Sequence, residues 1–437
     1  MNNMSLGLEG RRELRRFYYD HLFENILPFW TRNAVDSRYG GYYTGFANSG
    51  GELLHTHKFT WSQGRFVWVW AGLSGLIPGR TESGRYLKLA RSGAEFLMEN
   101  ALLPNGNCSF VLSREGDPIA LDNRGNRQEP TPDLRYDTST YADCFVVYGL
   151  SEYALVSGER RPFDFAYRLY QSILKIIDAG DFRTDPYPTP PGYRQHGVPM
   201  IMLETSRQLA AACDRFDAKL APGIRARADR FMREIMDGHR CSDRDVMIEF
   251  LSSDETLQDT MIGTYVNPGH TLECMWFILH YALEVGDRGL IGPVTSVVKR
   301  ALELGWDHDH GGLFQFVHVD GGRPRGPVPE EQENHTMIKK LRSNWDAKLW
   351  WVHSEALYTL LLCYSIDGRD WIEDWYLRIH DYTFGTFPAD DGTEWINVRN
   401  RDGSPSDRVV ALPVKDPFHV PRALMNLIRL LDEWEKQ

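Results

Sequence analysis

The spacing of apolar residues constrains the fold of this chain more than any other feature of its sequence. Along most of the 437 residues they recur at i, i+3, i+4 and i+7, which places them on one face of an α-helix. Gly, Pro, Asn and Asp concentrate between the periodic segments, as is typical of loops. The pattern predicts twelve helices, at residues 11–34, 60–76, 84–103, 139–157, 163–179, 199–216, 219–237, 268–286, 290–304, 345–365, 369–386 and 416–435.

Twelve helices can pair into six helical hairpins, and six hairpins closed in a ring form an all-α fold, the (α/α)6 barrel. No Gly/Ser linker or break in composition divides the chain, so we expect one catalytic domain over residues 1–437 instead of two helical domains. The longest connections, 104–138 and 305–344, are expected to lie over one mouth of the barrel, where functional groups usually gather. Short β-like pieces are expected in the connections, at 41–46, 108–112 and 312–319.

The overall charge and the scattered cysteines exclude several classes of protein. With 49 Lys and Arg against 60 Asp and Glu the net charge is −11, which repels phosphates and argues against a nucleic-acid partner. No apolar run reaches the ~20 residues needed to cross a bilayer, and the N-terminal segment lacks the apolar stretch of a signal peptide. We therefore expect a cytoplasmic protein with no membrane partner. The six cysteines form no C-x-x-C pair and are predicted to be buried thiols.

His270 is the first candidate for an acid/base group. Asn267-Pro268-Gly269 predicts a turn that opens a helix, which places His270 in the first helical turn. Glu273 lies three residues further on the same face, where its carboxylate could orient the imidazole. A general acid/base is held in this way, although the same spacing also fits a capping box.

His419 is the second candidate. It follows Pro417-Phe418 and precedes Pro421-Arg422, again at a turn that opens a helix. Arg422 lies one turn further and could bind a substrate oxygen. A buried histidine in the last helix is the alternative interpretation.

Four other segments carry groups capable of chemistry. Arg65 opens the second predicted helix and could grip paired oxygens, or form a surface ion pair. His353 lies in a helix beside Trp350 and Trp351. These aromatic side chains favour an aromatic wall at this place over a site for a nucleophile. His196, in Arg-Gln-His-Gly, also stands out. Asp307-His308-Asp309-His310 precedes two glycines and is interpreted as a tight turn, so no metal site is predicted.

A set of motifs extends over nearly the whole chain. The most specific are Asn267 to Glu273, Gly305 to Phe314, and Phe418-His419-Val420-Pro421-Arg422. The others are Lys58 to Arg65 followed by Val67-Trp68, Ala94 to Leu97, Phe110 to Arg114, Tyr141-Ala142-Asp143, Val198-Pro199-Met200, Lys348 to Trp351, His353 to Ala356, and Tyr382-Thr383-Phe384. In these motifs, and in their order along the chain, the sequence resembles the N-acylglucosamine 2-epimerase family, also called the renin-binding protein family.

The resemblance implies an (α/α)6 barrel that inverts C2 of a reducing sugar. The family's two catalytic histidines fall on His270 and His419. It further implies a homodimer, chemistry without a metal or redox cofactor, and ATP as an allosteric activator instead of a reactant. The residues matching the family's sugar-binding set are Arg65, Tyr141, Glu273, Trp351, His353 and Arg422.

The chemistry explains why two histidines are needed. The C2 proton of an open-chain aldose is acidic because the C1 carbonyl delocalises the charge into an enediolate. Inversion requires one group to remove this proton and another to deliver a proton from the opposite face. Imidazole suits both roles because it titrates near neutral pH. A cation such as Arg65 would stabilise the developing oxyanion.

The substrate is predicted from one position at which this sequence differs from some members of the broader group. Some members of the broader group carry a further histidine, for ring opening, at the position of Ile201. Its absence argues for interconversion of N-acetylglucosamine and N-acetylmannosamine, with His353 the first substitute for ring opening. An aldose–ketose isomerase or 2-epimerase of unmodified sugars, of the mannose, glucose, fructose or cellobiose type, is the alternative.

Two other classes stay open. One is a glycoside hydrolase or lyase on the same barrel, which needs a pair of carboxylates. The other is a non-catalytic protein-binding module, against which the retention of both histidines argues. The carboxylates available to a hydrolase are Asp137, Asp143, Asp307 and Glu355.

Overall fold

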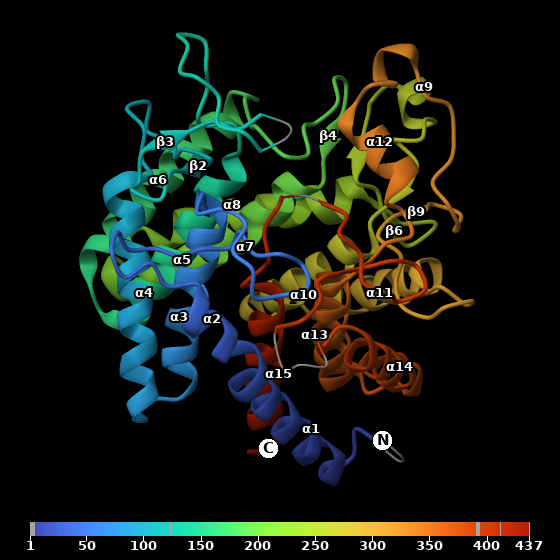
Figure 1. The fold of residues 1–437 in the computed structure, drawn as a ribbon. Helices are drawn as coiled ribbons and strands as arrows, with labels where there is room; N and C mark the ends of the chain where they lie inside the picture. The colour runs from blue at the N-terminus through green and yellow to red at the C-terminus, as the bar shows by residue number, and fades with distance from the viewer. Residues whose placement is uncertain (1–4, 123–124, 390–393, 411, 437) are drawn as a thin grey trace.

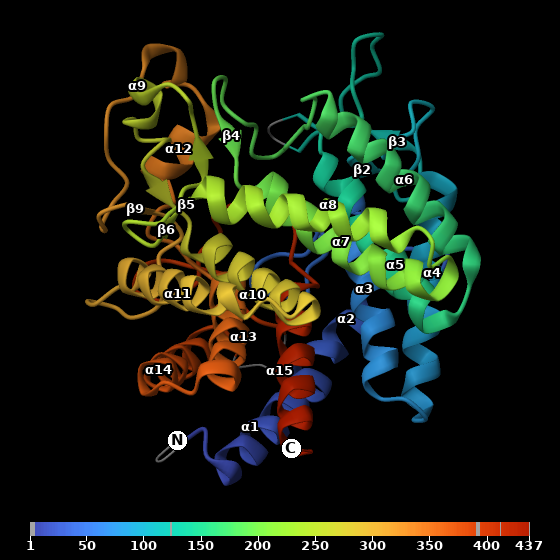
Figure 2. The ribbon, with the colours of Figure 1, turned by 180° about the vertical axis from the view of Figure 1, so that it is seen from behind.

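Six helices form a closed inner ring in the computed structural model, which describes residues 5–122, 125–389, 394–410 and 412–436 (Figures 1 and 2). Each inner helix packs against the next, and the last packs against the first. The predicted (α/α)6 barrel is therefore confirmed. The inner helices are α3 (Thr60–Leu76), α5 (Thr140–Ser157), α7 (Gly197–Phe216), α10 (Pro268–Val285), α13 (Trp350–Asp367) and α15 (His419–Glu435).

A second layer of helices surrounds the ring. Five outer helices pack against the inner helix that precedes them in the chain, to which a short turn joins them. The sixth, α1, packs against α15, and the ion pairs Arg12–Glu435 and Arg15–Asp432, both 2.8 Å, join the two. The first and last helices thus make the sixth hairpin. The outer helices are α1 (Leu8–Asp20), α4 (Thr81–Asn100), α6 (Arg160–Asp178), α8 (Ala221–Arg233), α11 (Ile291–Gly305) and α14 (Asp370–Thr386).

The two layers differ in how their residues are buried. The outer helix α6 buries Phe163, Ala166, Tyr170 and Ile173, a single stripe at helical spacing. The inner helices α3 and α13 are buried on nearly all sides, as expected of helices enclosed by the rest of the protein. Gly64 of α3 lies against the backbone of α5, where a Cβ would collide with the Phe145 carbonyl. Glycine here allows the close approach of two inner helices.

Long connections lead from each outer helix to the next inner helix and gather at one mouth of the barrel (Figure 1). The connections 104–138 and 305–344 lie there, as predicted. Two-residue antiparallel strands order these connections, and β1, β4, β8 and β10 lead directly into inner helices. The pairs are β1 (Lys58–Phe59) with β2 (Val111–Leu112), β2 with β3 (Pro118–Ile119), β4 (Arg194–Gln195) with β7 (Phe250–Leu251), β5 (Arg240–Cys241) with β6 (Val246–Met247), β8 (Tyr265–Val266) with β9 (Val317–His318), and β10 (Lys348–Leu349) with β11 (Val398–Arg399).

Shorter helical pieces complete the fold. The predicted helix 11–34 consists of α1, a π-helical turn and α2, and the helix predicted at 219–237 likewise ends in a π-helical turn. Helix α12 lies inside the connection 305–344 and was not predicted. These pieces are η1 (His21–Ile26), α2 (Leu27–Asn33), η2 (Glu234–His239), α9 (Glu255–Gln258), η3 (Arg288–Leu290), η4 (Glu330–Gln332) and α12 (Thr336–Ser343).

The tight turn predicted at residues 307–310 is confirmed. The buried Asp307 carboxylate accepts from Lys348 at 3.1 Å and from Arg401 at 2.8 Å, whereas His308 and His310 are exposed. Asp36 holds Lys58 in the same way, also at 3.1 Å. These two aspartates therefore fix the lysines that precede α13 and α3.

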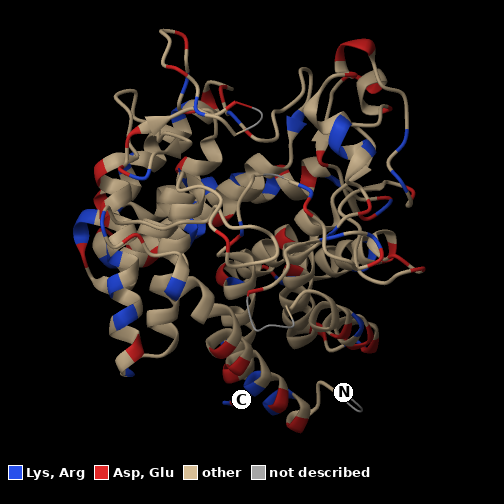
Figure 3. Ribbon diagram, viewed as in Figure 1, with Lys and Arg blue, Asp and Glu red and all other residues tan. Residues whose placement is uncertain are grey.

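The surface and the cysteines agree with the sequence-based expectations in part. Figure 3 shows basic residues interspersed with acidic ones over the outer helices and the mouth. In the described part of the chain, no helix has both the length and the apolar character needed to span a bilayer. All six cysteines are free thiols, and five are buried, whereas Cys241 is partly exposed.

Candidate active site

A pocket opens where the N-terminal ends of the inner helices meet the mouth. All six inner helices contribute side chains to its wall, and the connections between layers cover it. Helix N-termini carry partial positive charge, which suits a site where an oxyanion develops. The predicted site residues that line the pocket are Arg65, Tyr141, His270, Glu273, Trp351, His419 and Arg422.

His270 is held by a carboxylate from a different segment than predicted. The Asn267 side chain caps α10 by accepting from the His270 backbone N–H at 3.2 Å. The His270 Nδ1 lies 3.1 Å from Oε2 of Glu249, which is 1% exposed. The prediction that Glu273 orients this imidazole is therefore wrong. Burial alone lowers the pKa of His270, but the charge and hydrogen bond of Glu249, together with the Glu273 charge, outweigh burial and the net shift is upward.

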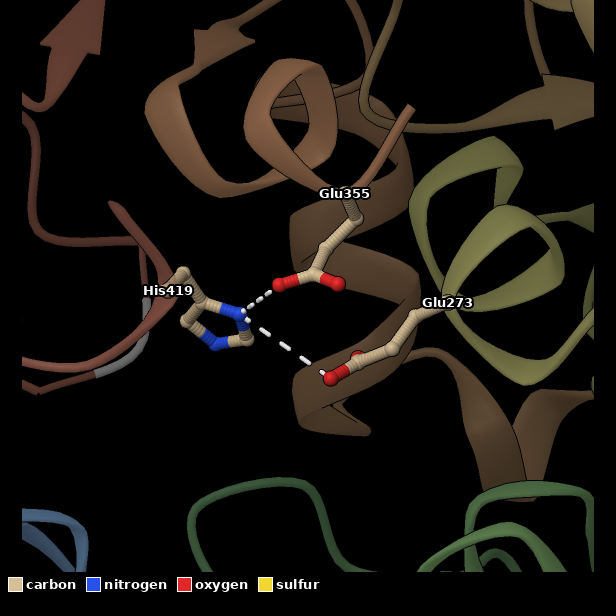
Figure 4. A group of neighbouring side chains, drawn as sticks. All are labelled: Glu273, Glu355 and His419. Atoms are coloured by element: carbon tan, nitrogen blue, oxygen red, sulfur yellow. Dashed lines mark hydrogen bonds and ion pairs between the residues drawn. The ribbon is translucent and has the colours of Figure 1, made fainter. Parts of the chain in front are cut away.

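His419 has a comparable arrangement. It is the first residue of α15, and its backbone N–H donates to the Asp416 carboxylate at 2.8 Å. Its Nδ1 lies 2.8 Å from Oε1 of Glu355, as Figure 4 shows. Glu355 also accepts from Trp276 at 2.8 Å and from Arg422 at 2.7 Å. Burial alone raises the pKa of Glu355, but Arg422 and His419 hold it below its usual range, so this carboxylate is ionised.

Arg422 joins the carboxylates on this side of the pocket. Its NH2 group donates to both Glu273 and Glu355, and Glu273 lies 3.9 Å from the His419 Nδ1. Ligand atoms of Glu273, Glu355 and His419 all lie within 4.8 Å of one another, which is close enough for a metal ion. Because the Arg422 guanidinium already lies against both carboxylates and supplies the positive charge, we interpret this cluster as an ion-pair network.

Aromatic rings connect the two histidines and surround Arg65. The Trp351 ring is 5.5 Å from the ring of His270 and 5.5 Å from that of His419, so it forms the wall between them. The Arg65 guanidinium lies 4.2 Å from the Phe145 ring and 3.1 Å from the Asp416 carboxylate. Asp416 therefore links Arg65 to the start of α15.

The structure does not bring His353 into the pocket. This residue is fully buried, its Nε2 accepts from the Leu313 N–H at 2.8 Å, and its Nδ1 donates to the Leu349 carbonyl at 2.7 Å. Burial lowers its pKa to about 3, so the ring is neutral. With both nitrogens bonded to backbone, His353 has none for a sugar, and we no longer assign it to substrate binding or ring opening.

The carboxylates considered for a hydrolase are engaged elsewhere. Asp137 pairs with Arg183, Asp143 accepts from the Cys108 N–H at 2.6 Å, and Asp307 holds Lys348. None of these three lines the described pocket. Glu355 is ion-paired with Arg422, so it does not supply the proton that a glycosidase acid needs.

Three functional side chains lie outside the set of residues predicted for the epimerase site. Glu249 binds His270, Glu355 binds His419, and Asp416 binds Arg65 and the backbone of His419. The Asp416 carboxylate accepts from the backbone N–H groups of Phe418 and His419, a local turn typical of Asp that could have identified it. Glu249 has no such local signal.

Two imidazoles, each paired with a buried carboxylate on one aromatic-walled pocket of an (α/α)6 barrel, define a carbohydrate epimerase or isomerase. The N-acylglucosamine 2-epimerase family matches residues 41–423, and the chain belongs to it.

Individual relatives agree with this assignment. N-acylglucosamine 2-epimerase of Bos taurus is 29% identical over 430 residues, covering 95% of this chain and 92% of its own. Cellobiose 2-epimerase of Spirochaeta thermophila has a TM-score of 0.73 at 18% identity, covering 98% of this chain and 99% of that one. A D-mannose isomerase has the same TM-score at 16% identity, covering 95% and 97%. At these identities the solved structures establish the shared fold.

Proposed function

We propose that this protein interconverts N-acetylglucosamine and N-acetylmannosamine. One of His270 and His419 removes the C2 proton, and the other returns a proton to C2. The observation that carries the proposal is the arrangement of these imidazoles, each with Nδ1 against a buried carboxylate and with Trp351 between them. The activity for which the bovine relative is named supports the choice of substrate.

The geometry suits proton transfer at Nε2. In the described part of the chain, neither His270 nor His419 uses Nε2 in a hydrogen bond, whereas Nδ1 of each faces a carboxylate. A carboxylate at Nδ1 fixes the tautomer and stabilises the imidazolium that forms when Nε2 accepts a proton. In the proposed reaction one neutral imidazole removes the C2 proton of the open-chain sugar, and the other, protonated, returns a proton to the opposite face. The two groups exchange protonation states in each turnover, and solvent resets them.

Two arginines lie close enough to the pocket to stabilise the enediolate. Arg65 and Arg422 both line it, and one guanidinium nitrogen of each, Nε, is buried and has no hydrogen-bond partner in the described part of the chain. A preorganised cation near a developing oxyanion favours the intermediate over the neutral sugar. The apolar side chains of Met200 and Ile201 also line the pocket and suit the methyl group of an N-acetyl substituent.

We further propose that the protein is cytoplasmic, forms a homodimer, and needs neither a metal nor a redox cofactor for this chemistry. Proton exchange at C2 consumes no electrons, and an ordered imidazole pair both removes the C2 proton and delivers its replacement. ATP is proposed as an allosteric activator only. Assays with and without ATP or a chelator, together with sedimentation of the purified protein, test these points.

The proposed function is tested by proton NMR in heavy water. The protein is incubated separately with N-acetylmannosamine, mannose, glucose and cellobiose. We expect deuterium at C2 of N-acetylmannosamine together with formation of N-acetylglucosamine. His270→Ala and His419→Ala should each reduce this rate by about 10²–10⁴-fold, the usual contribution of a general acid or base, whereas the exposed His310→Ala should not.

Other outcomes have defined meanings. Activity only on an unmodified hexose, with a ketose among the products, would replace the proposed substrate while keeping the two-histidine chemistry. Absence of C2 exchange in all four sugars would reject the proposed reaction.

A further inference from the structure

A third histidine lies behind His270. His196 directly precedes α7, is fully buried and does not contribute to the pocket wall. Neither of its ring nitrogens makes a hydrogen bond within the described residues. A buried polar group without a partner is unfavourable, so the group that faces this ring is expected to interact with it.

The group that faces His196 is the carboxylate that holds His270. Oε1 of Glu249 lies 3.4 Å from the His196 Nδ1 and has no hydrogen-bond partner among the residues that the structure describes, while Oε2 lies 3.1 Å from the His270 Nδ1. The backbone fixes this arrangement, because the His196 N–H donates to the Glu249 carbonyl at 2.8 Å beside the β4–β7 pair. One buried carboxylate therefore lies between two imidazoles.

We propose that His196 is a positioning residue that donates from Nδ1 to Oε1 of Glu249 and thereby limits how much of the carboxylate's charge acts on His270. This inference rests on the proposed role of His270 as an acid/base group. His196 touches neither the pocket nor the substrate, and its effect passes through Glu249.

Other titratable groups around Glu249 leave this interpretation in place. The His239 ring lies 5.3 Å from that of His196, and burial lowers its pKa to about 3, so it is neutral. Burial also raises the pKa of Tyr141, Tyr265 and Cys274, which are neutral as well. The remaining charged neighbours are Glu273, which binds Arg422, and Arg194, which lies 3.9 Å from Glu234.

The sign of the effect follows from charge sharing. A donor at Oε1 draws negative charge away from Oε2, so loss of the donor leaves more of that charge on His270. The pKa of His270 should then rise further, by about 0.5–1 unit. Loss of the carboxylate itself must do the opposite, because burial then dominates and lowers the pKa of His270. The two changes are therefore distinguished by direction.

The experiment compares His196→Leu, which removes the donor, with His196→Asn, whose amide can replace Nδ1. His380→Leu is the matched control, because this buried histidine also makes no ring hydrogen bond within the described residues, has a carboxylate near Nδ1 (Asp381, 3.7 Å), and lies in α14, outside the pocket wall. In protein labelled with ¹⁵N-histidine, NMR follows the titration of His270 without substrate. We expect an upward shift for His196→Leu, recovery in His196→Asn, no shift for His380→Leu and a downward shift for Glu249→Gln.

Kinetics give a second measurement. One of the two reaction directions requires His270 to be neutral when it removes the C2 proton. In that direction kcat of His196→Leu at pH 7 should fall by about three- to tenfold, since raising the pKa of His270 by one unit changes its neutral fraction by at most tenfold. KM should be unchanged, because His196 does not line the pocket. A merely structural role would lower stability without moving the His270 titration.

The inference is overturned if folded His196→Leu leaves the His270 titration unchanged or shifts it downward. If His196→Leu does not fold, the wild-type spectrum decides. Neutral His196 must be protonated at Nδ1, and the Nε2-protonated tautomer would contradict the proposal. Since the titration needs no substrate, a wild-type protein without C2 exchange would reject the proposed function while the coupling is still measured.

Discussion

Arg422 balances the charges of two buried carboxylates beside His419. Its NH2 group contacts Glu273 and Glu355, and both carboxylates have little contact with solvent. Wild-type Glu355, with its lowered pKa, stabilises the fold above the pKa of an unfolded glutamate and loses this contribution as the pH falls. The consequence of removing Arg422 therefore depends on pH.

We predict that Arg422→Met destabilises the protein by about 3–5 kcal/mol at neutral pH, because it leaves buried carboxylates without their cation. Burial then raises the pKa of at least one carboxylate above its unfolded value, so the cost is present at high pH and is relieved by protonation. Urea unfolding should show a larger loss at pH 8 than at pH 5. Arg429→Met, in the same helix, is the control, since among the described residues Arg429 donates to the Gly72 carbonyl and forms no ion pair. An equal loss at both pH values would contradict the argument.

At the scale of elements, periodicity predicted the helices well and their surroundings less well. All twelve predicted helices are present because each buries a stripe, or all, of its surface. Helix α12 has eight residues, too few for a periodic pattern to distinguish from a loop, although Met337, Ile338 and Leu341 are buried. The strands have two residues each, and their pairing depends on segments distant in sequence.

The same reason explains which site residues were predicted. His270, His419 and Arg422 stand at helix starts within family motifs, where local spacing is informative. Glu249 and His270 are 21 residues apart in sequence, and Glu355 and His419 are 64 apart. The members of each pair come into contact only because the barrel folds into a ring. His353 was misplaced because sequence does not show that Leu313 and Leu349 occupy both its nitrogens.

The buried ion pair between Asp307 and Lys348, which precedes α13, gives a prediction at the scale of elements. Asp307→Asn should destabilise the protein by about 3–5 kcal/mol because Lys348, fully buried, loses its counter-charge. Adding Lys348→Met should recover most of this loss, since an apolar side chain needs no partner there. Exposed Asp309→Asn is the control. Denaturant unfolding measures all three, and a double variant no more stable than Asp307→Asn would reject the account.

At the scale of the whole molecule, the chain closes on itself through α1 and α15. Helix α15 carries His419 and Arg422, and α1 packs against it with Leu14 and Tyr18 buried. In a closed ring each inner helix has two neighbours, so a defect in one hairpin weakens its neighbours on both sides. This topology favours unfolding of the helices of both layers as one cooperative unit.

We predict that Leu14→Ala in α1 and Leu169→Ala in α6, on separate outer helices, behave alike. Both side chains are buried, at 0% and 3% exposure, and each truncation should cost about 2–5 kcal/mol. Far-UV circular dichroism, which reports all helices, and tryptophan fluorescence, which reports mainly the inner ring and its surroundings, should give coincident denaturant transitions for both variants. If α1 and α15 of Leu14→Ala instead unfolded in a separate early transition, the contact between these two helices would be less stable than the rest of the barrel. Loss of C2 exchange in that variant would then precede loss of the remaining helices, because His419 leaves the pocket with α15.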